Sequence, residues 1–140
     1  MTCLFSDPRL PVGRHLIAEL SGVAPHLLAN PESIRALLVD AAQASGAHVL
    51  GANMHHFGEG QGVTGVVLLA ESHMSIHTWP EHGYAAIDIF VCGECEPRRA
   101  LERVVAAFGP CKCESGVIVR GMDGIKGQVG HLDAQLRCPA

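Results

Sequence analysis

Lysine is rare in this chain, which has only Lys112 and Lys126 among its 140 residues. An enzyme that holds its substrate as a lysine Schiff base would have to use one of these two, and neither has an activating neighbourhood in the sequence. Aromatic residues are also scarce, and there is no basic run or RNA-reading aromatic pattern. Because basic contacts to phosphates supply most of the affinity for nucleic acids, the net charge of −4 argues against a nucleic-acid partner.

Targeting and membrane segments are absent from the sequence as well. Residues 1–13 contain Asp7, Pro8 and Pro11 in place of the apolar core of a secretory signal. No apolar run approaches the roughly 20 residues that a membrane span needs. We therefore expect a cytoplasmic protein with no membrane contact, in which the six cysteines are thiols or ligands rather than a disulfide framework.

A glycine-rich stretch at residues 57–62 lacks both common nucleotide-binding patterns. It is not followed by the Gly-Lys-Ser/Thr of a phosphate loop. It is not followed by a helix either, as a dinucleotide fingerprint requires. The stretch is therefore expected to be a loop between two strands.

At this length the chain is expected to form a single domain over residues 1–140. Helical spacing of apolar residues predicts a helix that begins after the N-cap Asn30 and ends at Gly46, and a second that begins at Pro97 and ends at Gly109. The tail from Gly121 is weakly patterned and is expected to be mobile or on the surface. Five strands are predicted, at residues 14–20, 48–57, 64–70, 84–91 and 111–120.

The resulting order, β-α-β-β-β-α-β, predicts an α+β fold. Strands in adjacent runs favour a mainly antiparallel sheet, with both helices on one face, which is a two-layer α/β sandwich. The other face of such a sheet needs a cover, and a partner chain is the simplest one.

Reactive side chains are concentrated at residues 71–77, directly after the apolar strand predicted at residues 64–70. The stretch reads ESHMSIH and places two hydroxyls and two imidazoles where catalytic groups tend to lie, on a connection positioned by a scaffold. A serine at a strand end is ordinarily a turn residue. Ser72 with His77 could instead serve nucleophilic catalysis, with Thr64 one strand upstream. There is no Gly-x-Ser-x-Gly elbow to expose the serine.

The cysteines suggest a different kind of site. Cys92 and Cys95 are followed after fifteen residues by Cys111 and Cys113, which is close to a four-cysteine zinc spacing. The second pair has one spacer residue instead of two, and a predicted helix fills the gap. A non-enzymatic zinc-binding module is therefore an alternative, and buried thiols are the simpler interpretation.

One continuous block of the chain is distinctive. It reads LAESHMSIHTWPE (Leu69–Glu81), and it is followed by GYAAIDIF (Gly83–Phe90) and by Cys92-Gly93. These motifs closely resemble the short prokaryotic S-adenosylmethionine decarboxylases, which are pyruvoyl-dependent enzymes made as proenzymes. The resemblance covers roughly residues 13–120, and the central block is highly specific.

The resemblance implies self-cleavage between Glu71 and Ser72. The Ser72 hydroxyl attacks the Glu71 carbonyl and turns the amide into an ester. Elimination and hydrolysis then convert Ser72 into a covalent pyruvoyl group with release of ammonia. In the family, the residue at the His77 position takes the α-proton, and the hydroxyl at the Thr64 position assists the acyl shift. The products would be a β chain, residues 1–71, and an α chain, residues 72–140.

For turnover, the resemblance implies that the pyruvoyl cofactor forms a Schiff base with S-adenosylmethionine and accepts the electrons left by CO₂. The Cys92 position then supplies a proton, and the product is the aminopropyl donor for spermidine biosynthesis. Phe57 matches an aromatic that stacks on adenine, and Glu81 matches a carboxylate that binds the ribose hydroxyls. Some relatives of the same fold use arginine or ornithine, which need neither Phe57 nor Glu81.

The resemblance also implies a homodimer of cleaved protomers with two composite active sites. No residue is assigned to a metal. One protomer would supply pyruvoyl-72 and Cys92, and the other would supply Phe57, Thr64, His77 and Glu81.

Overall fold

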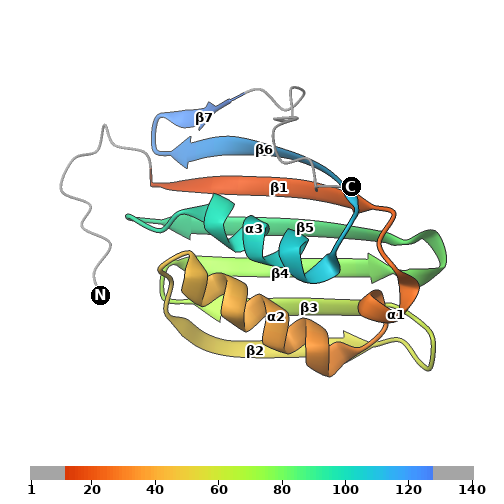
Figure 1. The fold of residues 1–140 in the computed structure, drawn as a ribbon. Coiled ribbons are helices and arrows are strands. Elements are labelled where there is room, and N and C mark those ends of the chain that lie inside the picture. Colours follow the sequence, from red (N-terminus) through yellow and green to blue (C-terminus); the bar gives the residue numbers. More distant parts are fainter. Residues whose placement is uncertain (1–11, 128–140) are drawn as a thin grey trace.

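The computed structural model describes residues 12–127 and shows an antiparallel sheet with helices on one face (Figure 1). The sheet has seven strands in the order β2-β3-β4-β5-β1-β6-β7. The strands are β1 (Gly13–Ser21), β2 (Val49–His56), β3 (Val63–Leu69), β4 (Ser72–Trp79), β5 (Tyr84–Cys92), β6 (Lys112–Gly121) and β7 (Gly124–Lys126). The helices are α1 (Pro25–Leu28), α2 (Pro31–Ala44) and α3 (Pro97–Phe108), and the 3-10 turn η1 (Pro80–His82) follows β4. The predicted two-layer α+β sandwich is confirmed.

Both long helices begin where their capping residues predict. The Asn30 side chain accepts hydrogen bonds from the backbone N–H groups of Glu32 and Ser33, at 3.0 and 3.1 Å. Pro31 occupies the first position of α2, where its missing N–H costs nothing. Gly109, with φ of 73°, ends α3 as predicted.

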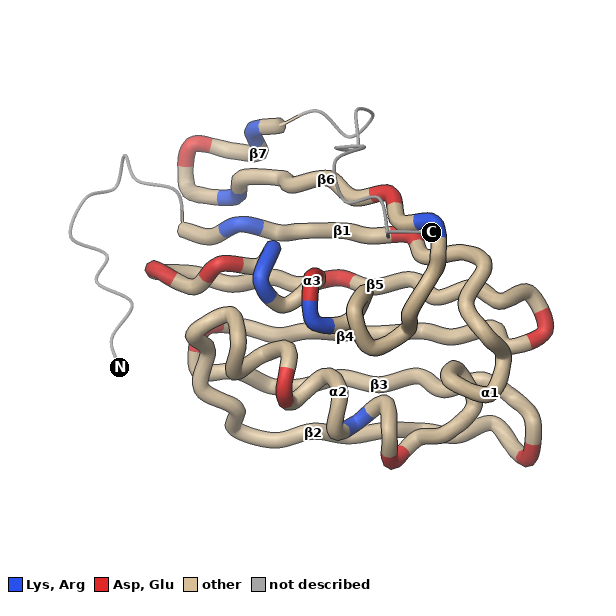
Figure 2. Tube along the Cα trace, in the orientation of Figure 1, with Lys and Arg blue, Asp and Glu red and all other residues tan. Residues whose placement is uncertain are grey.

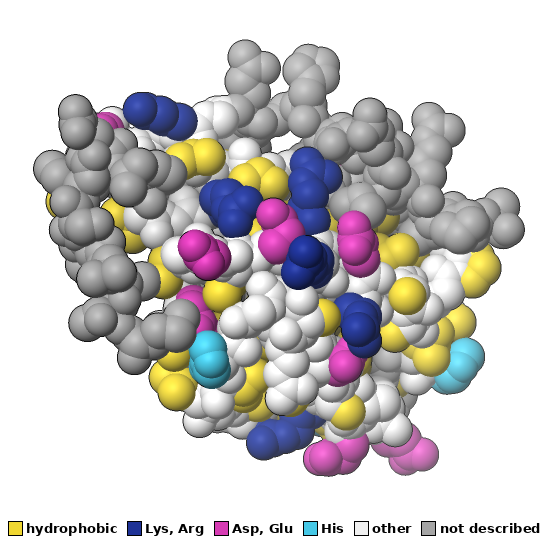
Figure 3. Space-filling model, turned by 60° about the vertical axis from the view of Figure 1, so that its left-hand side comes forward, with side chains coloured by type: hydrophobic (Ala, Val, Ile, Leu, Met, Phe, Trp, Pro, Cys, Tyr) yellow, Lys and Arg dark blue, Asp and Glu magenta, His cyan; other side chains and the backbone are white. Residues whose placement is uncertain are grey.

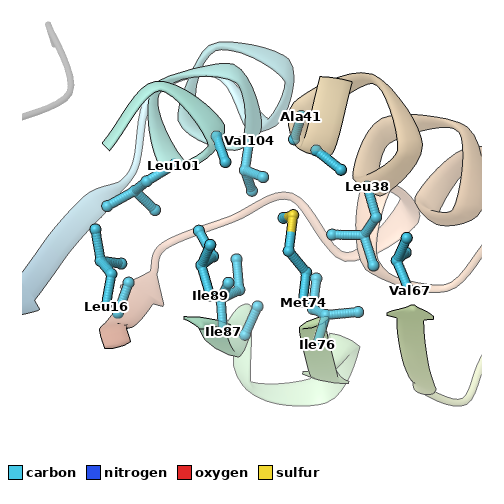
Figure 4. Packing of buried hydrophobic residues seen from close by; sticks show 14 of the residues in the cluster. Leu16, Leu38, Ala41, Val67, Met74, Ile76, Ile87, Ile89, Leu101 and Val104 are labelled. Atoms are coloured by element: carbon cyan, nitrogen blue, oxygen red, sulfur yellow. The ribbon is translucent and has the colours of Figure 1, made fainter. Parts of the chain in front are cut away.

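The core lies between the helices and the sheet face that they cover. Side chains alternate along each strand, so every second residue of β1, β3, β4 and β5 points into this layer. Figure 4 shows α2 and α3 meeting the sheet through these apolar side chains. The labelled contacts come from Leu38, Ala41, Leu101 and Val104 of the helices and from Leu16, Val67, Met74, Ile76, Ile87 and Ile89 of the strands.

Three elements differ from the prediction. The stretch expected to be a polar connection is β4, a central strand of the sheet. Its alternation of buried Met74 and Ile76 with polar neighbours is the period of two that a half-buried strand requires. Residues 25–28 form α1 instead of a plain connection, and the start of the expected tail forms β7. Residues 1–11, and residues 128–140 of that tail, lie outside the described residues.

The other face of the sheet, which we call the open face, is not covered by a helix in the described part of the chain (Figure 1). Figure 2 shows that β2, β3 and β4 carry no Lys, Arg, Asp or Glu. Elsewhere, acidic and basic side chains are interspersed on the side seen in Figure 3. Arg14–Glu96 at 3.0 Å and Arg103–Asp40 at 3.2 Å are two of the ion pairs. Among the described helices, none is long and apolar enough to span a membrane.

Candidate active site

The predicted site residues lie at two opposite ends of β4. Strand β4 begins at Ser72, which pairs with Val91 beside Cys92, and runs to the right in Figure 1. We call this beginning, with the β3–β4 turn, the hairpin end. Five residues further along β4, His77 pairs with Thr64 of β3. We call that region the histidine end; it also includes Phe57, which follows β2, and Glu81 in η1.

The hairpin end is built around a tight two-residue turn. Leu69 pairs with Ser72, so only Ala70 and Glu71 connect β3 to β4. Ser72 has φ of 133°, and no other non-glycine residue in the range 12–127 has a positive φ. Such a conformation costs about 1–3 kcal/mol and persists only where surrounding contacts enforce it. The backbone N–H of Cys92 donates to the Glu71 carbonyl oxygen at 3.0 Å, so the carbonyl next to the strained serine is polarised.

The side chain of Glu71 is buried, with 3% of its surface exposed, and both carboxylate oxygens bind His48. The His48 backbone N–H donates to Oε2 at 2.9 Å, and ring Nδ1 lies 2.7 Å from Oε1. Burial alone would raise the pKa of this carboxyl, but the hydrogen bonds from His48 outweigh it and hold the pKa below its ordinary value. A carboxylate only accepts, so Nδ1 carries the donated proton.

At the histidine end, the Thr64 hydroxyl lies 3.0 Å from Nδ1 of His77. Both side chains are on the open face, since their neighbours Val63 and Thr78 are buried in the core layer. Phe57 is 62% exposed, and its ring meets the ring of His55 edge-on at 4.6 Å between centroids. Thr64 and His77 are therefore in contact at one end of β4. Glu71, Ser72 and Cys92 lie together at the other end, away from that pair.

Cys92 is disulfide-bonded in this structure. The zinc arrangement suggested by the sequence is not formed by the described cysteines. Cys92 lies beside Gly13 of β1, and Cys113 lies beside Leu20 of the same strand. Gly13 and Leu20 are seven residues apart along β1, so the two cysteine pairs lie about 23 Å apart at the usual strand rise. Burial, and next the charge of Glu71, raise the pKa of the Cys95 thiol.

A groove of about 660 Å³ opens beside Ser72 on the open face. Its walls combine apolar side chains with imidazole, hydroxyl and guanidinium groups, and Arg120 lies over the Phe90 ring at 4.5 Å. Of these lining residues, Ser72 was predicted to react, and His73 and Ser75 belong to the same polar stretch at residues 71–77. The missed signal was the period of two, which places His73 and Ser75 of β4 on the same face of the sheet as Phe90 of β5. The lining residues are Val66, Leu68, Ser72, His73, Ser75, Phe90 and Arg120.

Next to the groove, ligand atoms of His15, His73 and Asp88 lie within 4.8 Å of one another. By residue type they could hold a metal ion. However, His15 Nε2 already lies 3.2 Å from Asp88 Oδ2, and the Arg120 guanidinium lies 3.5 Å from the Nδ1 of His15. A fixed cation at that place repels a second one, so the cluster is better described as a hydrogen-bond network that joins β1, β4 and β5.

Comparison with known proteins supports the sequence resemblance. The family model described as S-adenosylmethionine decarboxylase matches residues 14–121. The S-adenosylmethionine decarboxylase proenzyme of Caldicellulosiruptor saccharolyticus is 52% identical over 112 residues, which cover 79% of this chain and 90% of that protein. The proenzyme of Thermodesulfovibrio yellowstonii is 40% identical over 126 residues, covering 89% and 88%.

A solved structure agrees with these relatives. The adenosylmethionine decarboxylase from Aquifex aeolicus superimposes with a TM-score of 0.72 at 37% sequence identity, covering 80% of this chain and 92% of that one. Fold and sequence together thus place the chain in a class of α+β enzymes named as decarboxylases. It belongs to the S-adenosylmethionine decarboxylase family.

Proposed function

We propose that the chain cleaves itself between Glu71 and Ser72 and then decarboxylates S-adenosylmethionine. The observation that carries this proposal is the geometry of the turn, in which the strained Ser72 follows a carbonyl that accepts a hydrogen bond from the Cys92 N–H. The name proenzyme, carried by the relatives, supports it. The cytoplasm is the expected compartment, and the product would be the aminopropyl donor for spermidine synthesis.

Cleavage begins with attack of Ser72 Oγ on the Glu71 carbonyl carbon. The C–N bond breaks, the hydroxyl proton passes to the nitrogen, and an ester replaces the amide. Thr64 and the Cys92 N–H stabilise the oxygen on which negative charge develops. His77 then takes the Cα proton of residue 72, and the bond between Cβ and Oγ of residue 72 breaks to release the main-chain carboxylate of Glu71. Hydrolysis of the remaining dehydroalanine yields the pyruvoyl group and ammonia.

A single described chain cannot bring these groups together. Ser72 and His77 are five residues apart along β4, which separates them by about 17 Å at the usual strand rise. We infer a two-fold homodimer in which open faces meet, so that the hairpin end of one copy contacts the histidine end of the other. The face suits this role because β2–β4 carry no charged residues and Leu68 is 55% exposed.

Turnover assigns a second set of roles. The pyruvoyl group, when present, supplies the carbonyl that binds the substrate amine and takes up the electrons released with CO₂. Cys92, at the hairpin end, donates the final proton, which requires its reduced thiol. The exposed ring of Phe57 stacks on adenine. Glu81 accepts hydrogen bonds from the ribose hydroxyls.

Intact-mass measurement of the purified, denatured protein tests the cleavage. We expect two chains that together cover residues 1–71 and 72–140, and a single uncleaved chain for Ser72→Ala. A wild-type chain that stays intact after long incubation would refute the proposal. Release of CO₂ is then compared for S-adenosylmethionine, arginine and ornithine in the presence of dithiothreitol. A preference for arginine or ornithine would refute the assigned substrate while leaving the cleavage proposal intact.

A further inference from the structure

His48 is bound to the turn at Ala70–Glu71 by three hydrogen bonds. Its carbonyl accepts from the Ala70 N–H at 2.9 Å, its N–H donates to Glu71 Oε2 at 2.9 Å, and its ring donates to Oε1 at 2.7 Å. Neither the family resemblance nor the sequence pattern assigns His48 a role. His48 lies just before β2, in the loop that follows α2.

The turn is thus held from both sides. On one side His48 fixes the Glu71 carboxylate, and on the other the Cys92 N–H fixes the Glu71 carbonyl. Between these two points the chain has little freedom to relax the strained φ of Ser72. The acyl shift passes through a small ring that forms when Ser72 Oγ attacks the Glu71 carbonyl carbon, so its rate depends on the orientation of that oxygen. A misplacement of about 1 Å can cost about 100-fold in rate.

We propose that His48 is a positioning residue for self-cleavage: its ring holds the Glu71 side chain, and this keeps the scissile carbonyl oriented for attack by Ser72. This inference rests on the proposed cleavage between Glu71 and Ser72. The backbone N–H of His48 remains when alanine or glutamine replaces it, so only the ring contact is lost. The His48 side chain is 65% exposed, so its replacement leaves no large cavity in the core.

The test follows conversion of the full chain in pulse–chase cell-free synthesis, by denaturing gel and intact mass. His48→Ala should cleave about tenfold more slowly than wild type, a change that corresponds to about 1.4 kcal/mol in the barrier. The uncleaved chain should resist hydroxylamine, because the acyl shift is delayed and no ester accumulates. His48→Gln keeps a side-chain N–H donor and should recover part of the rate.

Two controls separate positioning from loss of structure. His26→Ala makes the same change at an exposed histidine of α1, at the other end of the sheet, and should cleave like wild type. Circular dichroism at the assay temperature restricts the comparison to folded chains. In a double-mutant cycle, Glu71→Ala should leave His48→Ala with little further effect, since removing the carboxylate already removes the contact with the His48 ring.

The outcomes distinguish the positioning role of His48 from self-cleavage itself. A wild-type chain that never cleaves refutes self-cleavage itself. A wild-type chain that cleaves while His48→Ala cleaves at the same rate refutes the positioning role alone. Equal slowing in His48→Ala and His48→Gln, with additive effects in the cycle, also overturns it, because the ring contact would then not be the cause.

Discussion

Complementation between two inactive variants tests the composite site directly. Ser72→Ala removes the proposed nucleophile at the hairpin end, and His77→Ala removes the proposed proton acceptor at the histidine end of β4. Because about 17 Å of strand separates these positions, neither end can repair the other within one chain. In a two-fold dimer of one chain of each kind, one site carries both lesions and the other carries neither.

The expected yield follows from the pairing. Equal amounts of two chains that pair at random give about half heterodimers, and each heterodimer has one intact site. That site cleaves the chain that still has Ser72, so about a quarter of all chains should be cut, and all of them should carry His77→Ala. Both variants alone should stay uncut.

The assay is co-expression with two different affinity tags, tandem purification and intact mass of each chain. Tandem purification keeps only heterodimers, which raises the expected cut fraction to about half of the chains. Cleavage of chains carrying Ser72→Ala would contradict the chemistry. Purified heterodimers with no cleavage above either parent would refute the division of the site between two copies.

Three further outcomes are expected. Cys92→Ala should still cleave, because its backbone N–H remains, but its CO₂ release should fall strongly in reductant, and kinetics equal to wild type would remove Cys92 from turnover. Asn30→Ala should lower the free energy of unfolding by about 1 kcal/mol, measured by urea denaturation, because it removes the α2 cap, while Asn30→Asp should stay near wild type. Burial raises the pKa of Asp88, but the hydrogen bonds from Ser75 and His15 lower the pKa by more than burial raises it, so the net pKa lies below its ordinary value. Asp88 therefore adds stability above about pH 4 and loses it as pH falls through the folded-state pKa, so the stability difference between wild type and Asp88→Asn should shrink in acid. A difference that is unchanged between pH 7 and pH 3 would contradict that assignment.

Local signals predicted much of the fold. The cap at Asn30, the proline at position 97 and the stop at Gly109 are read from a few neighbouring residues, and the helices begin and end there. The strand β4 was missed because its serines and histidines suggested a loop, although Met74 and Ile76 had the spacing of a buried strand face.

The site could be predicted residue by residue but not as a geometry. The motif names Ser72 and His77 without showing that a straight strand keeps them apart. The contact between His48 and Glu71 depends on the alignment of β2 with β3, which shifts between Val49 and Gly51. No local pattern encodes that shift, so no sequence signal indicated His48.

The strand order has a consequence for the protein after cleavage. A cut in the β3–β4 turn would assign β1, β2 and β3 to one fragment and β4 to β7 to the other. Strand β1 lies between β5 and β6, so the first fragment is inserted into the middle of the second. Three ladders, β3–β4, β5–β1 and β1–β6, would join the pieces, and α2 packs beside α3 over them. The two fragments could not separate without unfolding. The fragments of the cut enzyme should therefore stay associated on dilution, and they should not exchange between molecules.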